Sequence, residues 1–271
     1  MSISDEQRVQ LERDGYFIAR GLLTRDQTEE IRAALLGRTR ELASSGDYGN
    51  DKILEVAAQG DPDSVPLHER FRKLNALDTL PALWNHWYAG PSVLAILSTW
   101  LGPDVLRKYA SAFLKPARVG GPTPWHQDIG LWRDTNCDAA NGWLAIDAAT
   151  IANGCLKCVP GSHQRPVIEH VEYEDSLHAE LPRDRCQDLE IKHIELDPGD
   201  AVFWHSHLWH ASDANTSNAS RIGVGAVWVN PAQISQLTNV RRLRWAVRHG
   251  SRFPHPAPEM IVMTNPEGEE R

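Results

Sequence analysis

Residues 198–212 read PGDAVFWHSHLWHAS and set the pattern of the second half of the chain. A Pro-Gly-Asp turn leads into a short apolar run, which is typical of a β-strand over Ala201–His205. From about residue 104 onward, short apolar runs separated by turn residues recur. The other candidate strands are Val105–Leu114, Trp143–Asp147, Leu156–Val159, Ile191–Leu196 and Ile222–Val229.

The first hundred residues have helical signals instead. Serine or threonine followed three positions later by glutamine forms a capping box at residues 4–7 and again at 24–27, so helices should begin near residues 5 and 25. The apolar residues 15–18 form a turn between them. Pro91 opens a third helical run, which Gly102-Pro103 ends.

These patterns predict one domain of 271 residues with mixed secondary structure. We expect a helical prelude over about 1–103, a β core over about 104–245 and a C-terminal tail over about 246–271. Many short strands after a helical prelude favour a jelly roll or related barrel with flanking helices. The polar stretch 44–66 is expected to be a surface loop able to cover a site.

Composition argues for a small-molecule ligand. A net charge of −8 and a pI near 5.8 argue against nucleic acid or an anionic membrane, because both need a concentrated basic surface. No apolar run is long enough to span a membrane, and the N-terminus lacks a secretory pattern, so we expect a cytoplasmic protein. Cys155 and Cys158 have the spacing of half a zinc site or of a redox pair, but their position in a predicted strand favours structural thiols. No motif indicates an oligomeric state.

One histidine and one aspartate suggest a metal site. His126 and Asp128 are two positions apart, and residues i and i+2 of an extended chain point to the same face. The stretch 203–210 offers three further histidines. Two imidazoles and one carboxylate form the facial triad of non-haem Fe(II) oxygenases. Zinc hydrolysis uses the same ligand types, so a cupin-like zinc hydrolase or isomerase stays open.

Five pieces of the chain together resemble the phytanoyl-CoA dioxygenase family of Fe(II)- and 2-oxoglutarate-dependent oxygenases. They are WHQD (125–128), NGCL (153–156), VPGSH (159–163), PGDAVFWHSHLWHAS (198–212) and Arg221. The resemblance extends from about residue 5 to 245. It implies a double-stranded β-helix core of the cupin-like jelly-roll type, and Fe(II), 2-oxoglutarate and O2 as cofactor and cosubstrates.

The resemblance also selects the third metal ligand. In the family the distal histidine precedes the cosubstrate arginine by eleven positions, which pairs His210 with Arg221 and leaves His205 and His207 as supporting residues. His126, Asp128 and His210 are therefore the expected metal ligands and catalytic centre. Arg221 is expected to bind 2-oxoglutarate.

Other roles are implied by position in the family. Ser212 resembles the hydroxyl that assists the arginine in holding the distal carboxylate of 2-oxoglutarate. Trp143 matches an aromatic residue that lines this pocket, and Lys73, in RKLN (72–75), resembles a lysine that some members direct at the cosubstrate. Trp132 and Arg133 occupy the place of substrate-contacting loop residues.

Alternation along the last long strand supports the cosubstrate site independently. It places Arg221, Gly223 and Gly225 on one face of the strand. Glycine inside a strand loses packing, and close approach of a ligand is a reason to tolerate it. A guanidinium beside two glycines therefore predicts a slot for a carboxylate, which arginine binds through two parallel hydrogen bonds.

The carboxylate at Asp128 narrows the reaction. Halogenating members of the family replace this residue by a small one, so its presence favours hydroxylation, or another C–H oxidation such as desaturation or ring formation, with release of succinate and CO2. Arg107, Lys108, Lys115 and Arg133, with Trp132, suit a small anionic or zwitterionic substrate such as an aminophosphonate or amino-acid derivative. The alternatives are oxidative tailoring of secondary metabolites and a non-catalytic ligand-binding barrel.

Overall fold

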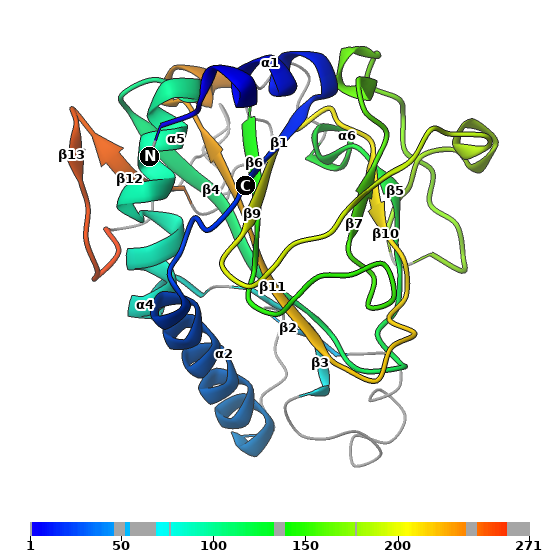
Figure 1. Cartoon of the computed structure of the whole chain (residues 1–271), viewed down its shortest axis with the longest axis horizontal. Coiled ribbons are helices and arrows are strands. Elements are labelled where there is room, and N and C mark those ends of the chain that lie inside the picture. The colour runs from blue at the N-terminus through cyan, green and yellow to red at the C-terminus, as the bar shows by residue number, and fades with distance from the viewer. Residues whose placement is uncertain are drawn as a thin grey trace, which may run out of the picture.

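The computed structural model describes residues 2–45, 52–54, 69–75, 77–132, 139–176, 178–236 and 243–258. Two antiparallel sheets lie side by side, and helices cover the outer face of the larger sheet (Figure 1). The predicted fold class, a jelly roll with flanking helices, is confirmed. The division into one domain with the boundaries given above stays a prediction.

The larger sheet has nine strands, seven of them in the order β1-β9-β6-β11-β4-β12-β13, while β3 pairs with β4 and β2 with β3. Its central strands are the longest in the described chain, and every residue of β11 is buried. The bounds are β1 Tyr16–Ala19, β2 Lys52–Leu54, β3 Phe71–Asn75, β4 Val105–Lys115, β6 Ala139–Ala145, β9 Ala201–His205, β11 Arg221–Val229, β12 Arg244–Arg248 and β13 Ser251–Arg252.

The smaller sheet has four short strands in the order β5-β10-β7-β8. They are β5 Thr123–His126, β7 Leu156–Cys158, β8 Lys192–Ile194 and β10 His210–Ser212. In Figure 1 this sheet lies to the right of the larger one, opposite the helices. The space between the sheets is therefore lined by side chains from both.

Helices α2, α4 and α5 lie along the left of the larger sheet in Figure 1, and α1 lies above it. The α-helices are α1 Asp5–Asp14, α2 Arg25–Ser45, α4 Pro81–Leu83, α5 Pro91–Leu101 and α6 Asp128–Trp132, and a π-helix spans Trp84–Tyr88. Short 3-10 helices span Leu77–Thr79, Ser162–Gln164, Arg183–Cys186 and Pro231–Gln236.

The predicted helix starts are confirmed by their caps. Ser4 Oγ accepts a hydrogen bond from the backbone of Gln7, whose side chain accepts one from the backbone of Ser4. Thr24 and Gln27 make the same reciprocal pair at the start of α2. Each box satisfies backbone N–H groups that a helix N-terminus leaves unpaired.

As predicted, successive side chains of β11 point alternately into the core under the helices and into the interior between the two sheets. Ile222, Val224, Ala226 and Trp228 pack in the core between the larger sheet and the helices. Arg221, Gly223 and Gly225 face the other way, toward the smaller sheet. The apolar layer under the helices therefore provides a rigid base, and polar chemistry is confined to the space between the sheets.

Two strand predictions were wrong in extent. The strand expected at Trp143–Asp147 is β6, Ala139–Ala145, because alanine, asparagine and glycine at its start have low strand propensity and hid it. Asp147 lies beyond the strand, where its carboxylate accepts a hydrogen bond from the Ile222 backbone at 2.7 Å. The strand expected at Ile191–Leu196 is shortened to Lys192–Ile194.

The prelude contains strands as well as the predicted helices, turn and loop. Residues 16–19 form β1, which pairs with β9, and the RKLN segment belongs to β3, which pairs with β4. Both segments are too short for periodicity to show, and their partners are remote in the chain. Within the expected 44–66 loop, 52–54 form β2, and most of the rest lies outside the described residues. The expected irregular tail contains β13, Ser251–Arg252.

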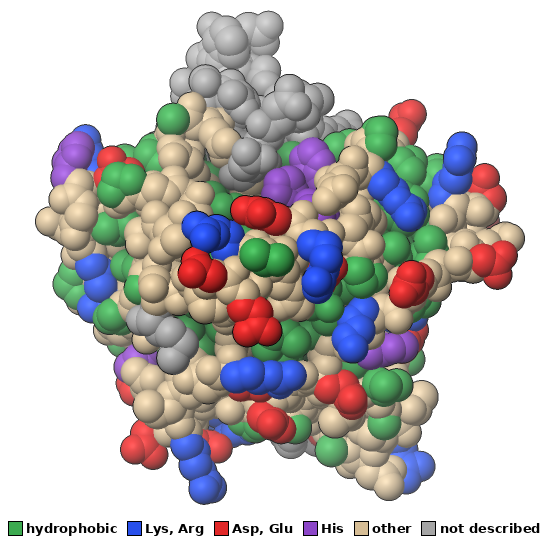
Figure 2. All heavy atoms as spheres, turned by 45° about the horizontal axis from the view of Figure 1, so that its top comes forward, with side chains coloured by type: hydrophobic (Ala, Val, Ile, Leu, Met, Phe, Trp, Pro, Cys, Tyr) green, Lys and Arg blue, Asp and Glu red, His purple; other side chains and the backbone are tan. Residues whose placement is uncertain are grey.

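The surface has no single charge sign on the face drawn in Figure 2, where Lys and Arg side chains alternate with Asp and Glu. Among the described helices, none has the length and apolar character needed to cross a membrane. The predicted cytoplasmic location stays a prediction.

Candidate metal centre and cosubstrate pocket

The structure brings His126, Asp128 and His210 together between the two sheets. One potential ligand atom from each lies within 4.8 Å of the others. Nε2 of His126 is 3.8 Å from one carboxylate oxygen of Asp128, and Nε2 of His210 is 3.6 Å from the other. Among the described residues this is the only group of three such side chains, and its N, N, O donor set suits a first-row divalent metal.

Different elements supply the three side chains. His126 ends β5 and His210 begins β10, and the two residues are direct partners in the smaller sheet. The sequence pattern predicted that Asp128 continues the extended strand. Asp128 is instead the first residue of α6. The turn between strand and helix, and not the alternation of an extended chain, brings the carboxylate to the imidazoles.

Both imidazoles are oriented by backbone carbonyls. His126 Nδ1 lies 2.8 Å from the Pro124 carbonyl, and His210 Nδ1 lies 2.9 Å from that of Leu208. A proton on Nδ1 donates to this carbonyl and leaves Nε2 as the free lone pair, an arrangement that fixes histidine ligands in metal sites. Burial, together with His210, holds the pKa of His126 well below its usual value, so its imidazole is neutral, as metal binding requires.

The sequence pattern predicted that His205, His207 and His210 lie on one extended stretch, and this prediction was wrong. β9 ends at His205 in the larger sheet, and β10 begins at His210 in the smaller one. The turn between them separates the side chains. The rings of His205 and His207 lie 4.8 Å apart, centroid to centroid, and neither joins the triad.

Sequence reasoning missed the residues that support the triad. Trp204 Nε1 donates a 3.2 Å hydrogen bond to Asp128 Oδ2, and its ring centroid is 5.1 Å from that of His210. The Gln127 side chain, fully buried, bonds the His207 carbonyl and the Ile168 N–H. The alternation of β9 could have found Trp204, because it points Trp204 inward together with Val202.

Two more histidines from the segment between β7 and β8 lie beside the triad. The His178 ring centroid is 5.2 Å from that of His126, and His170 Nε2 accepts a hydrogen bond from the Gln127 backbone. Burial lowers the pKa of both His170 and His178. This segment therefore closes one side of the metal site with neutral rings, which no local sequence motif indicates.

Arg221 begins β11 and is buried, with 3% of its surface exposed. Its guanidinium carbon is 4.9 Å from the Trp143 ring centroid, and Nε has no hydrogen-bond partner. No carboxylate of the described chain lies within 4.0 Å of it. Burial lowers the pKa of Arg221 to about 10, so it carries a charge at neutral pH. An unpaired buried cation is costly, and a bound carboxylate would remove that cost.

Lys115 adds a second buried cation. It is the direct partner of Arg221 in the pairing of β4 with β11. Its Nζ donates a 2.8 Å hydrogen bond to Ser212 Oγ and bonds the Asp213 carbonyl. Lys115 therefore belongs to the predicted cosubstrate pocket with Arg221 and Ser212, and not to the substrate end where the sequence interpretation placed it.

The glycines of β11 do not leave an open slot, contrary to prediction. A Cβ on Gly223 would lie 1.8 Å from the Trp143 ring, and one on Gly225 would lie 2.8 Å from the ring of Phe113. The missing side chains make room for these two aromatic rings. The Trp143 ring in turn forms an apolar wall beside the Arg221 guanidinium.

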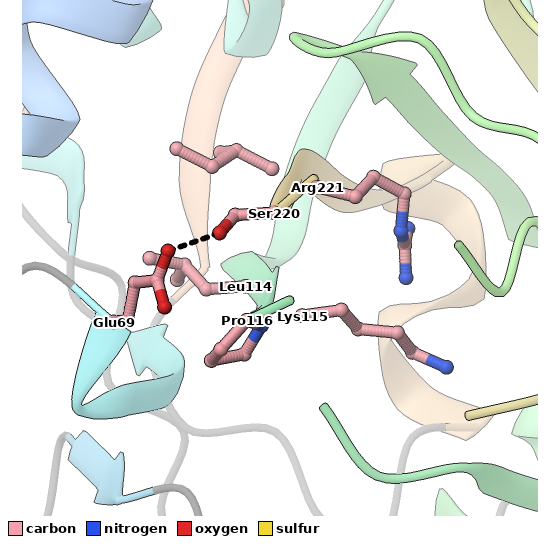
Figure 3. Close-up of a pocket in the computed structure, with 7 residues that line it drawn as sticks. Glu69, Leu114, Lys115, Pro116, Ser220 and Arg221 are labelled. Atoms are coloured by element: carbon pink, nitrogen blue, oxygen red, sulfur yellow. Dashed lines mark hydrogen bonds between the residues drawn. The ribbon is translucent and has the colours of Figure 1, made fainter. Parts of the chain in front are cut away.

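Figure 3 shows Lys115 and Arg221 extending away from the hydrogen bond between Ser220 and Glu69. The cavity lined by these residues has a volume of about 20 Å³, enough for about one water molecule. It lies at the end of the sheet and is too small for a dicarboxylate, so it is not the cosubstrate pocket.

Lys73 faces the interior from β3. It pairs with Phe113 in the register, and its Nζ lies 5.1 Å from the ring centroid of Tyr109 and 5.4 Å from that of Phe113. Its charge contributes to lowering the pKa of His178. Lys73 therefore lies toward the metal site, and its contact with 2-oxoglutarate stays a prediction.

The expected substrate contacts have mixed outcomes. Trp132 ends α6, and Lys108 Nζ is 3.8 Å from its ring centroid. Arg133 lies outside the described residues. Arg107, expected near the pocket, instead faces the helices and forms a 2.6 Å ion pair with Asp78. A β-bulge in the pairing of β4 with β11 causes the error, because it reverses the alternation there.

Cys155 and Cys158 are buried and free. Burial raises the pKa of Cys155 to about 11 and that of Cys158 to about 12. Protonated thiols in an apolar cluster do not bind metal or react readily, as expected for structural residues.

Comparison with known proteins agrees with this geometry. The family model described as phytanoyl-CoA dioxygenase (PhyH) matches residues 11–223. The peroxisomal phytanoyl-CoA dioxygenase of Rattus norvegicus is 25% identical over 228 residues, 81% of this chain and 66% of the rat protein. A 1-deoxypentalenic acid 11-beta-hydroxylase of Streptomyces arenae is 26% identical over 216 residues, 75% of this chain and 72% of that protein.

A solved structure has the same fold. It is EctD from S. alaskensis with 2-oxoglutarate and 5-hydroxyectoine, with a TM-score of 0.69 and 20% sequence identity. The match covers 89% of this chain and 79% of that one.

Proposed function

Because the chain belongs to the phytanoyl-CoA dioxygenase family of iron- and 2-oxoglutarate-dependent oxygenases, we propose that it oxidises a C–H bond of a small anionic molecule, in the first instance by hydroxylation. His126, Asp128 and His210 hold Fe(II). Arg221, with Lys115 and Ser212, holds the distal carboxylate of 2-oxoglutarate. Iron, when bound, supplies the activation of O2.

One observation carries this proposal. Arg221 is a buried cation that has no carboxylate partner among the described residues. It faces the same interior as the His-Asp-His group. A cupin-like zinc hydrolase would use the triad but has no need for a buried arginine and lysine side by side. A dicarboxylate cosubstrate needs a cation that binds the carboxylate at its distal end and a metal that binds its 2-oxo acid end.

The protein's own part in the reaction is binding and orientation. The Nδ1 hydrogen bonds direct both imidazoles at the metal, and Trp204 holds Asp128. The resemblance to the family implies that halogenating members have a small residue in place of Asp128, whereas this chain has the carboxylate, which would be available to hold iron. These residues therefore support C–H hydroxylation over halogenation.

The charge of the interior supports an anionic substrate. Lys73 and Lys108 lie on the aromatic rings of Tyr109 and Trp132. Since Lys108 already occupies one face of Trp132, an ammonium group of a zwitterion would meet like charge there. We therefore favour a carboxylic or phosphonic acid, whose negative end the two lysines attract.

A second candidate is tailoring of a secondary metabolite. It is favoured by the similarity to the Streptomyces arenae hydroxylase, which acts on 1-deoxypentalenic acid. The two candidates are compatible if the metabolite is an acid.

Anaerobic titration with Fe(II) and 2-oxoglutarate tests the proposed cofactors. We expect the weak visible charge-transfer band of an iron-chelated 2-oxo acid in the wild type, and its loss in His210→Ala. Absence of joint binding in the wild type refutes the oxygenase proposal. Succinate release with a panel of acids, zwitterions and uncharged polycyclic compounds then tests the substrate class, and turnover of uncharged compounds alone contradicts it.

A further inference from the structure

We propose that Asn141 is a substrate-binding residue that recognises an amide-like group, meaning a hydrogen-bond acceptor and donor side by side, on the molecule that is oxidised. This inference rests on the proposed function, since it gives that substrate a second polar group besides its acid.

Asn141 lies in the middle of β6, and its side chain faces the interior between the sheets. Ala139 and Trp143, two positions away on either side, both face that interior. Ala140 and Leu144, at the alternate positions of the strand, lie in the core under the helices. Alternation therefore assigns Asn141 to the same interior as the triad.

The neighbours of Asn141 connect it to the metal site. Its direct partner on β9 is Trp204, whose indole bonds Asp128 and packs against the ring of His210. On the other side its partner on β11 is Val227, which pairs in turn with Tyr109. Facing side chains of paired residues are about 5 Å apart, so only the width of one indole separates Asn141 from the triad.

The amide of Asn141 is buried and unpartnered. The residue is 1% exposed, and neither Oδ1 nor Nδ2 has a hydrogen-bond partner among the described residues. Buried polar side chains in folded proteins nearly always have one. Strands also disfavour asparagine. Asn141 therefore destabilises the fold in two ways, through its unpaired buried amide and through its low strand propensity.

Asn215 provides the contrast. It is fully buried, but its Nδ2 donates to the carbonyls of Lys115 and Ala219, and its Oδ1 accepts from the Ser217 backbone and hydroxyl. That is how this chain uses a structural asparagine. Asn141 has the same burial without the bonds, which indicates a partner from outside the chain.

The chemistry of that partner follows from the carboxamide, which offers both an acceptor and donors. A carboxylate only accepts, so it would leave Oδ1 unpaired. This excludes the acid of the substrate and both carboxylates of 2-oxoglutarate as full partners. A lactam or primary amide satisfies both atoms at once. The apolar Val227 beside Asn141, with the aromatic Tyr109 on the next strand, suits the hydrocarbon part of such a molecule.

The first test compares the thermal stability of metal-free wild type, Asn141→Leu and Asn215→Leu. Leucine has nearly the shape of asparagine without its polar atoms. Asn141→Leu should raise the melting temperature by roughly 2 °C or more, because an unpaired buried amide is removed, whereas Asn215→Leu should lower it by at least as much. An unchanged or lowered melting temperature of Asn141→Leu means that its amide is already satisfied, and overturns the proposal.

The second test uses two ring probes of the same size and ligand-observed NMR. 2-Piperidone presents an acceptor and a donor side by side, and cyclohexanone presents only the acceptor. We expect 2-piperidone to bind the wild type in preference to cyclohexanone, and about tenfold more weakly to Asn141→Leu. Equal binding of the two probes, no binding of 2-piperidone, or binding that the variant retains overturns the assignment.

A third measurement separates this inference from the proposed function. In the anaerobic titration, Asn141→Leu should bind Fe(II) and 2-oxoglutarate as the wild type does. A loss of 2-oxoglutarate affinity in the variant assigns Asn141 to the cosubstrate and overturns its role toward the substrate. Failure of the wild type to bind iron and 2-oxoglutarate refutes the proposed function instead, whatever the two stability and probe results are.

Discussion

Replacement of Arg221 by methionine should separate two effects of the buried guanidinium. One is its unfavourable effect on folding stability, and the other is its contribution to binding of 2-oxoglutarate. Methionine keeps much of the length and volume of the side chain beside Trp143 but removes the charge. Burial lowers the pKa of Arg221 from 12.5 to about 10, which corresponds to about 3 kcal/mol against the charged form. Because the folded-state pKa is the lower one, this penalty is present throughout the pH range below about 10 and is relieved only above it.

Two effects of opposite sign follow for Arg221→Met. The cosubstrate-free protein should melt at an equal or higher temperature than the wild type. Binding of 2-oxoglutarate should weaken, because two parallel charge-assisted hydrogen bonds are lost. With Lys115 still present, we take about 3 kcal/mol for the loss, a factor of about 150 in Kd.

The assay is anaerobic titration of iron-loaded protein with 2-oxoglutarate, followed by the visible charge-transfer absorption, with parallel thermal melts. Arg221→Lys is the matched control. It keeps the charge without the two-pronged geometry, so its Kd should lie between those of wild type and Arg221→Met. A Kd of Arg221→Met within threefold of the wild type would refute the reasoning.

Three further predictions concern the triad and the thiols. Asp128→Ala should abolish substrate-dependent succinate release through loss of iron, measured by metal analysis and turnover, and normal activity of this variant would remove the triad assignment. Trp204→Phe, which loses the hydrogen bond to Asp128, should weaken Fe(II) binding by about tenfold without unfolding the protein, and an unchanged iron Kd would contradict a supporting role. Since burial raises the pKa of Cys155 to about 11 and of Cys158 to about 12, the unfolded chain loses these protons first as pH rises above about 9, so the free energy of unfolding should fall between about pH 9 and 11. Denaturant titrations should show a smaller fall for Cys158→Ala, and an equal fall would mean that this thiol does not contribute.

The sequence was most informative where the signal is local. The capping boxes at Ser4 and Thr24 act within four residues, and each predicted helix begins where its box places it. The alternation of β11 is equally local and correctly divided the core from the interior. His126 and Asp128 were chosen from residue type and spacing, and His210 from the resemblance to the phytanoyl-CoA dioxygenase family. The structure brings one potential ligand atom of each to within 4.8 Å of the others.

The sequence was least informative where a residue's position depends on a remote partner. β1 and β3 are strands because β9 and β4 bind their edges, and four or five residues alone do not encode that pairing. Arg107 was placed on the wrong side because one bulge in the register reverses which face a side chain takes. The glycines of β11 suggested a ligand slot, but what fills the space, Trp143 and Phe113, comes from other strands.

By itself, the sequence determined the helix starts, the jelly-roll class and the chemical inventory of the metal and cosubstrate sites. Only the tertiary structure decided that α6 turns Asp128 toward the imidazoles, that Lys115 stands beside Arg221, and that Asn141 is buried without a partner. The physical reason is the sequence separation over which each interaction acts. Capping and alternation act between residues a few positions apart, whereas burial and pairing in a two-sheet fold depend on strand register between segments a hundred residues apart.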